Sequence, residues 1–220
     1  MFGTLKKEKE FYKKSSFLAR LGSGSASRSV YQNYVVWGHN KEVINSSDEI
    51  AIPLKININP VFKNLHDSIL ITSSETKKVS SSMGHGLMND HPYSKARYKQ
   101  AKNNLKNLIA ALKSGDEQSF TSIVENEALS LHSLMLSSQP GFTLLNEISW
   151  EIINRIRSYR ELTGTPVCFT LDAGPNVHVL YPDKYARQVK EFIKSDLLQF
   201  CEKNNWIDDE IGNRADRLNH

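Results

Sequence analysis

The fold is decided by the stretch Val167-Cys-Phe-Thr-Leu-Asp172-Ala-Gly-Pro-Asn176-Val-His-Val-Leu-Tyr181, which predicts a β-hairpin. Two runs of mostly apolar and β-branched residues flank the turn Asp-Ala-Gly-Pro-Asn. Gly permits positive φ, Pro fixes φ, and Asp and Asn hydrogen-bond their own backbone. The turn places the Asp172 carboxylate at the end of a buried strand, where we expect poor solvation unless a reaction uses it. A plain turn-capping role for Asp172 is the simpler alternative.

The rest of the chain predicts helices and strands around this hairpin. Periodicity and turn signals indicate a basic amphipathic helix over 5–21 and a second helix after the Gly/Ser loop that follows it. Strands are predicted over 50–58 and 67–73. Three helices are predicted between 92 and about 159, and a last helix from Pro182 to about Lys203. The tail from Asn204 is polar, with only Ile207 and Ile211 as apolar anchors. This order predicts an α+β fold, with helices packed on one face of an antiparallel sheet.

Composition bounds the class of protein. The chain has 220 residues, enough for one large domain or for one domain and part of another. Hydrophobic residues make up 39% and charged residues 24%, which is typical of a globular protein. The net charge of +4 suits an anionic small ligand as well as nucleic acid. The basic residues form no arginine-rich tract with interleaved aromatics, so no nucleic-acid partner is expected.

The cysteines and the apolar runs indicate a compartment. Cys168 and Cys201 are too few for a disulfide framework and are interpreted as reduced thiols. The seven histidines form no metal-ligand spacing, so no metal site is expected. The N-terminal lysines precede no apolar core, and no apolar run is long enough to span a bilayer. We therefore expect a cytoplasmic protein without a membrane partner.

A Gly/Ser loop, Gly22-Ser23-Gly24-Ser25-Ala26-Ser27-Arg28-Ser29, is a candidate anion site. Small residues let the backbone approach a ligand, and serines donate hydroxyls and cap the helix that we expect next. The N-terminus of that helix and the forked Arg28 cation would suit a phosphate or diphosphate. A flexible linker is the alternative, although the segment from Tyr34 to Trp37 is unlike one. The loop is not a Walker A sequence, because no Gly-Lys-Ser/Thr ends it.

A second loop, Lys77-Lys78-Val79-Ser80-Ser81-Ser82-Met83-Gly84-His85-Gly86, repeats this composition. Its hydroxyls and two glycines precede the start of a predicted helix, so it is a second candidate anion cradle. An ordinary Ser/Gly loop is the simpler interpretation.

Three motifs together resemble the diphosphomevalonate decarboxylases of the GHMP kinase superfamily. They are Ala19-Arg20-Leu21-Gly22-Ser23-Gly24-Ser25-Ala26-Ser27-Arg28-Ser29, Val79-Ser80-Ser81-Ser82-Met83-Gly84 and Phe169-Thr170-Leu171-Asp172-Ala173-Gly174-Pro175-Asn176. The resemblance extends over most of the chain. It implies that residues 1–50 are the remnant of an N-terminal domain and that 51–220 are a ferredoxin-like C-terminal GHMP kinase domain.

The resemblance also implies an activity. Such an enzyme uses ATP, with Mg²⁺, to phosphorylate the 3-hydroxyl of diphosphomevalonate, and loss of phosphate and carbon dioxide then gives isopentenyl diphosphate. Asp172 matches the catalytic aspartate of the family, as a base or as a group that orients the hydroxyl and stabilises developing positive charge. The residues that match the family's substrate contacts are Ser23, Ser25, Arg28, Ser81 and Ser82.

Departures from the family leave alternatives open. The family's enzymes are longer, and neither their N-terminal substrate lysine nor their ATP-phosphate loop is recognisable here, so ATP-binding residues stay unknown. Gln32-Asn33 stand where the family usually has two glycines. The chain is expected to be a fragment, a truncated gene product or half of a split enzyme, with a homodimer or a missing N-terminal half as partner. A related GHMP small-molecule kinase and a catalytically incomplete subunit are the alternative functions.

Overall fold

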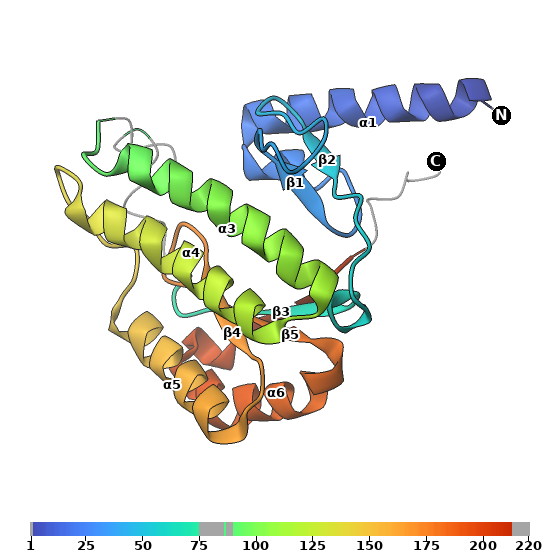
Figure 1. Cartoon of the computed structure of the whole chain (residues 1–220). Helices are drawn as coiled ribbons and strands as arrows, with labels where there is room; N and C mark the ends of the chain where they lie inside the picture. Colours follow the sequence, from blue (N-terminus) through green and yellow to red (C-terminus); the bar gives the residue numbers. More distant parts are fainter. Residues whose placement is uncertain (1, 75–85, 87–89, 213–220) are drawn as a thin grey trace. The chain divides into compact units, whose positions relative to one another are not determined.

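The computed structural model describes residues 2–74, 86 and 90–212, and the chain divides into two compact units (Figure 1). Unit 1 comprises Met1–Asn57 and Ile211–His220, and unit 2 comprises Ile58–Glu210. Each unit is described by itself below.

Unit 1 is built on α1 (Phe2–Gly22), a 3₁₀ turn (Ser25–Ser27) and the antiparallel pair β1 (Val35–Trp37) and β2 (Ala51–Pro53). The helix predicted after the Gly/Ser loop is therefore wrong, since a three-residue 3₁₀ turn and then a strand follow instead. β-Branched and aromatic residues favour a strand over a helix, and pairing with β2 fixes Val35–Trp37 as a strand. The strand predicted over 50–58 is confined to Ala51–Pro53.

Ser16 ties the parts of unit 1 together. Its hydroxyl is fully buried, donates to the Ser27 carbonyl over 2.8 Å and accepts from the Ala51 N–H over 2.9 Å. The helix is thereby joined to the Gly/Ser loop and to β2. The expected apolar anchors of α1 are not buried in the unit: Phe11 is 53% exposed, and Leu18 and Leu21 are 63% exposed.

Unit 2 contains a four-stranded antiparallel sheet in the order β4-β5-β3-β6. Its strands are β3 (Leu65–Leu70), β4 (Cys168–Leu171), β5 (Val177–Pro182) and β6 (Trp206–Glu210). β4 and β5 form the predicted hairpin, with Phe169 opposite Val179. The sequence analysis gave no strand in the polar tail, and β6 corrects this. β6 pairs with β3 through its backbone while its residues after Trp206 stay exposed, so no buried face marks it in the sequence.

The described helices that accompany this sheet are α3 (Ser94–Ser114), α4 (Glu117–Ser137), α5 (Glu147–Thr163) and α6 (Ala186–Phe192). α3 and α4 lie side by side (Figure 1). Between them, Gly115 adopts φ 84° at the end of α3, and the Asp116 carboxylate caps α4 by accepting from the Ser119 N–H over 2.9 Å. The predicted last helix is divided, because α6 runs into a π-helical turn at Ile193–Leu197 and a 3₁₀ turn at Leu198–Phe200.

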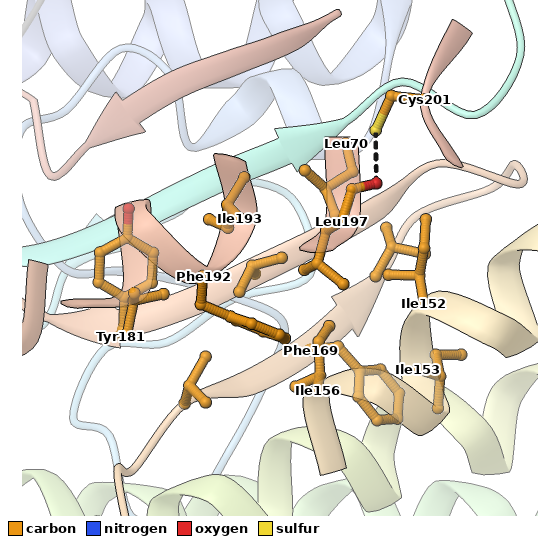
Figure 2. Packing of buried hydrophobic residues seen from close by; sticks show 14 of the residues in the cluster. Leu70, Ile152, Ile153, Ile156, Phe169, Tyr181, Phe192, Ile193, Leu197 and Cys201 are labelled. Carbon is orange, nitrogen blue, oxygen red and sulfur yellow. Dashed lines mark hydrogen bonds between the residues drawn. The ribbon is translucent and has the colours of Figure 1, made fainter. Parts of the chain in front are cut away.

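The main core lies on one face of this sheet (Figure 2). Strand residues of that face pack against α5 and α6, and Tyr159 stacks on Phe192 with ring centroids 4.0 Å apart. The buried residues of this core include Leu70, Phe169, Val177, Val179, Tyr181, Ile152, Ile153, Ile156, Ile193 and Leu197. The opposite face carries the half-buried Asp67 and His178, and there the Thr121 hydroxyl of α4 contacts Cys168. The prediction of an α+β fold with an antiparallel sheet is confirmed.

Candidate functional site

The turn between β4 and β5 is fixed from both sides. The Pro175 carbonyl accepts hydrogen bonds from the Thr72 hydroxyl over 2.9 Å and from the Ser149 hydroxyl over 2.7 Å. Thr72 follows β3, and the fully buried Ser149 belongs to the capping box that begins α5. The Asn176 Oδ1 accepts from the Thr72 N–H over 2.9 Å. Two segments that are far apart in the sequence, the end of β3 and the start of α5, therefore hold one turn in place.

Asp172 opens this turn with its carboxylate toward solvent. The residue is exposed, its Oδ1 accepts from the Ala173 N–H over 2.7 Å, and its backbone carbonyl accepts from the Gly174 N–H over 2.8 Å. The expectation of a poorly solvated carboxylate is therefore wrong. The strand ends at Leu171, so Asp172 is already outside the buried part of the sheet. The residue is therefore accessible to a substrate.

A histidine and a second carboxylate lie on the same side of the sheet. The His178 Nδ1 is 3.0 Å from Asp67 Oδ2 and 3.1 Å from Asp67 Oδ1. Burial lowers the pKa of His178, but the hydrogen bond to Asp67 and the charges of Asp67 and Asp172 outweigh it, so this pKa lies above its ordinary value. The Asp172 carboxylate thus interacts electrostatically with the His178 imidazole, and this interaction favours the protonated imidazole.

His132 of α4 contacts the backbone of Asp172. Its buried imidazole hydrogen-bonds the backbone of Asp172. Burial lowers the pKa of His132, and the hydrogen bond and the Asp172 charge oppose this only in part. His132 therefore favours the neutral form, and it positions the strand end rather than adding a charge there.

In unit 1, the predicted substrate residues lie in and around an open pocket of about 560 Å³. Ser25 and the exposed Arg28 line it, and the Ser23 hydroxyl is 3.3 Å from the Ser25 hydroxyl without lining the pocket. Tyr31 and Tyr34 also line the pocket, and burial raises the pKa of both phenols, so they remain protonated. A cation with several hydroxyl donors suits an anion, although the helix N-terminus expected to assist is not there.

Two details of this loop explain its sequence. A Cβ added to Gly24 would be 2.5 Å from the Trp37 ring, and that ring is fixed by its Nε1–H, which donates to the Asp48 carbonyl over 2.9 Å. Asn33 adopts φ 58°, in the left-handed region, which asparagine tolerates better than most residues. The change from the family's glycine to Asn33 is therefore compatible with this backbone.

The remaining predictions fall outside the described residues. Ser81 and Ser82 lie there with the rest of the Val79–Gly84 motif. The described chain stops before them at Ser74, whose N–H and hydroxyl both donate to the Glu202 carboxylate.

Two searches of the described residues bear on other classes of site. Within residues 2–74, 86 and 90–212, no group of three or more His, Cys, Asp or Glu residues is arranged to hold a metal ion. No helix in the described part of the chain is both long and apolar enough to cross a membrane.

The sequence reasoning missed Thr72, Ser149, Asp67 and His178. One signal was available for His178, because a polar residue between the buried Val177 and Val179 must point away from the core. Asp67 becomes its neighbour only through the register of β3 with β5, in which Asp67 faces Leu180 and Ile69 faces His178. Thr72 and Ser149 carry no local signal, since they act on a turn about 100 and 26 residues away.

A family model for the mevalonate 5-diphosphate decarboxylase C-terminal domain matches residues 68–217. The match covers more than half of the chain and includes the whole turn around Asp172. The chain belongs to this family. The resemblance predicted from the three motifs is thereby confirmed.

Curated relatives in this family are similar in sequence over most of this chain. Diphosphomevalonate decarboxylase of Ganoderma lucidum is 29% identical over 185 residues, which are 81% of this chain and 46% of that protein. The human diphosphomevalonate decarboxylase is 29% identical over 181 residues, which are 81% of this chain and 44% of that protein. The chain thus spans less than half the length of these relatives.

Solved structures of mevalonate diphosphate decarboxylases share the fold. The Staphylococcus aureus enzyme matches with a TM-score of 0.78 and 30% identity, over 92% of this chain and 59% of that one. A structure of MDDEF in complex with MVAPP matches with a TM-score of 0.77 and 27% identity, over 92% of this chain and 61% of that one. A further structure, of MDDEF with MVAPP, AMPPCP and magnesium, has a TM-score of 0.77 and 26% identity, over 92% of this chain and 59% of that one.

The contact between Gly24 and Trp37 generates a stability prediction. Gly24→Ala is expected to destabilise unit 1 by about 1–3 kcal/mol, because the added methyl group overlaps a ring that is held in place. Urea unfolding followed by tryptophan fluorescence measures this change. Gly22→Ala is the matched control, since its added Cβ meets no atom within 4 Å. Equal stability of the two variants would contradict the packing described here.

The two donors to the Pro175 carbonyl generate a second prediction. Thr72→Val and Ser149→Ala are each expected to cost about 1 kcal/mol, because the carbonyl keeps one partner in each single variant. The double variant is expected to lose at least about 1 kcal/mol more than the sum, since the carbonyl then has no partner. A double-mutant cycle of unfolding free energies measures this coupling. Additive losses would show that the two hydroxyls do not act on one group.

Proposed function

We propose that this chain carries the Asp172-bearing part of a diphosphomevalonate decarboxylase. The proposed reaction is ATP-dependent phosphorylation and decarboxylation of diphosphomevalonate to isopentenyl diphosphate. The observation that carries the proposal is that the family match includes a turn that is held from two sides, by Thr72 and by Ser149, and that presents an exposed aspartate. The named relatives and the solved complex with MVAPP support the same activity.

Asp172 is the proposed catalytic residue. Phosphoryl transfer to a tertiary hydroxyl depends mostly on positioning and on charge stabilisation. An ionised carboxylate on a fixed turn can accept the hydroxyl proton or orient the hydroxyl. It can also stabilise the positive charge that develops at the same carbon as phosphate leaves.

The substrate's anionic groups are assigned to the serine loops. Ser23, Ser25 and Arg28 are proposed to hold the diphosphate and the carboxylate, which agrees with the cation and hydroxyl donors around the pocket of unit 1. Ser81 and Ser82 are proposed to contact the substrate near the transferred phosphate, on the family motif alone. Residues 1–50 then represent the remnant of an N-terminal domain, and 51–220 the C-terminal GHMP kinase domain.

ATP with Mg²⁺ is the proposed co-substrate. A relative of the same fold has been solved with AMPPCP and magnesium, which supports this at the level of the family. The described residues offer no cluster of carboxylates and histidines for a resident metal, so we assign Mg²⁺ to the ATP complex. Bound to ATP, the ion would neutralise the phosphate charge that builds up during transfer. No ATP-binding residue is assigned in this chain.

Two other functions remain as candidates. The exposed Phe11, Leu18 and Leu21 side chains of α1 favour a catalytically incomplete subunit that acts only with a separate ATP-binding partner. A related GHMP small-molecule kinase would phosphorylate its substrate without releasing carbon dioxide. Neither candidate changes the residues proposed to hold the substrate.

A turnover assay separates these functions. The protein is incubated with ATP, Mg²⁺ and diphosphomevalonate, and phosphate and carbon dioxide are measured together. The proposal predicts equal release of both, and Asp172→Asn is expected to lower kcat by at least about a hundredfold. The matched control is Asp209→Asn, because Asp209 is also exposed and its Oδ1 likewise accepts from the next N–H, over 2.8 Å.

Each other outcome contradicts the proposal in a specific way. Phosphorylated product without carbon dioxide would indicate the kinase. Release of neither product would reject turnover by this chain alone, and recovery on adding an ATP-binding partner chain would indicate the incomplete subunit. Full activity of Asp172→Asn would remove the role given to Asp172.

A further inference from the structure

Asp67 and His178 form a hydrogen-bonded pair on the sheet face away from the main core. Both carboxylate oxygens of Asp67 lie 3.0–3.1 Å from the same imidazole nitrogen, Nδ1. The His178 side chain is 20% exposed and that of Asp67 is 34% exposed. A charged pair in such a partly buried place is screened less by salt than one on the open surface. Neither residue belongs to the main core of unit 2, which lies on the other face of the sheet.

The register brings this pair to the end of the sheet that carries Asp172. His178 lies opposite Thr170, and Asp172 is two residues beyond Thr170, so the pleat of β4 continued by one residue places Asp172 on the side of His178. The carboxylate of Asp172 acts on His178 electrostatically. Within the residues that the structure describes, His178 is thus a neighbour of Asp172 on its own sheet face, and Asp67 holds its imidazole ring.

The other titratable groups near this face do not replace that cation. His132 meets the backbone of Asp172 and favours the neutral form. Cys168 lies further along the face, and burial raises its pKa, so its thiol stays neutral. Beyond Cys168, the buried Glu125 carboxylate is paired with Arg160 over 2.6 Å.

We propose that His178, anchored by Asp67, is a positioning residue that orients the Asp172 carboxylate and supports its negative charge during the reaction. This inference rests on the proposed function of Asp172. A cation beside a carboxylate stabilises its charged form. Asp67 fixes the imidazole ring and favours its charged form, so the three residues act as one chain of charges from β3 through β5 to the end of β4.

The obvious alternative is that the Asp67–His178 pair only joins β3 to β5. In that case, loss of His178 would alter stability without altering how activity depends on pH. A positioning role predicts that loss of His178 does alter how activity depends on pH, because the charge of His178 acts on the Asp172 carboxylate. The test therefore needs a direct measure of coupling and a kinetic measure.

The coupling is measured by NMR titration of the His178 imidazole in the full chain, with His178→Gln used to assign the signal. Asp67→Asn is expected to move the His178 titration midpoint to lower pH, because a hydrogen bond and a charge are lost. Asp172→Asn is expected to move the midpoint in the same direction, and Glu191→Gln, an exposed residue of the helix that packs on the other face, to leave it in place. An unchanged midpoint in Asp172→Asn would overturn the proposal whether or not the chain turns over substrate.

The kinetic arm applies once turnover is observed. His178→Gln is expected to lower kcat/KM by on the order of tenfold, mainly through kcat, and to move the acid limb of the pH profile to higher pH. His178→Lys keeps a positive charge there and is expected to return the limb toward its original position. An unchanged profile in His178→Gln with unaltered unfolding would overturn the proposal. Absence of turnover in the unmodified chain would count against the proposed function, while the NMR titration would still decide this inference.

Discussion

The Pro175 carbonyl is the group on which the described site depends. It accepts from the Thr72 hydroxyl after β3 and from the Ser149 hydroxyl in the first turn of α5. A hairpin turn with one such contact could still move about its strand ends. With both contacts, and with Asn176 bonded to the Thr72 backbone, the turn has a single position relative to β3 and α5. The direction of Asp172 then follows from the fold of unit 2.

The groups that hold the turn in place differ from the charged groups near Asp172. Neutral hydroxyls, an amide and the buried His132 hold the backbone of the turn, while the charged groups lie on the sheet face that leads to Asp172. A fixed carboxylate needs little reorganisation when charge develops beside it. Unit 1 supplies a different kind of environment, with a forked cation and hydroxyl donors around an open pocket. The two units thus divide the work expected for an anionic substrate with a reacting hydroxyl.

The sequence predicted the features that depend on local signals. The turn residues gave the hairpin, and Asp116 gave the start of α4. It failed where partners far along the chain decide. Val35–Trp37 became a strand by pairing with β2, and Trp206–Glu210 joined β3 without burying a face. The exposure of Asp172 and its neighbours Asp67 and His178 could not be predicted, since strand register and strand length fix them.

The central claim is that the turn between β4 and β5 presents the Asp172 carboxylate to the reacting hydroxyl of diphosphomevalonate. The most direct measurement is a titration of ¹⁵N-labelled protein with diphosphomevalonate, observed by NMR. The account predicts that the backbone amides of Ala173 and Gly174, which follow Asp172 in the turn, shift as the substrate is added. Amides of Ala173 and Gly174 that stay in place at a saturating substrate concentration would contradict it.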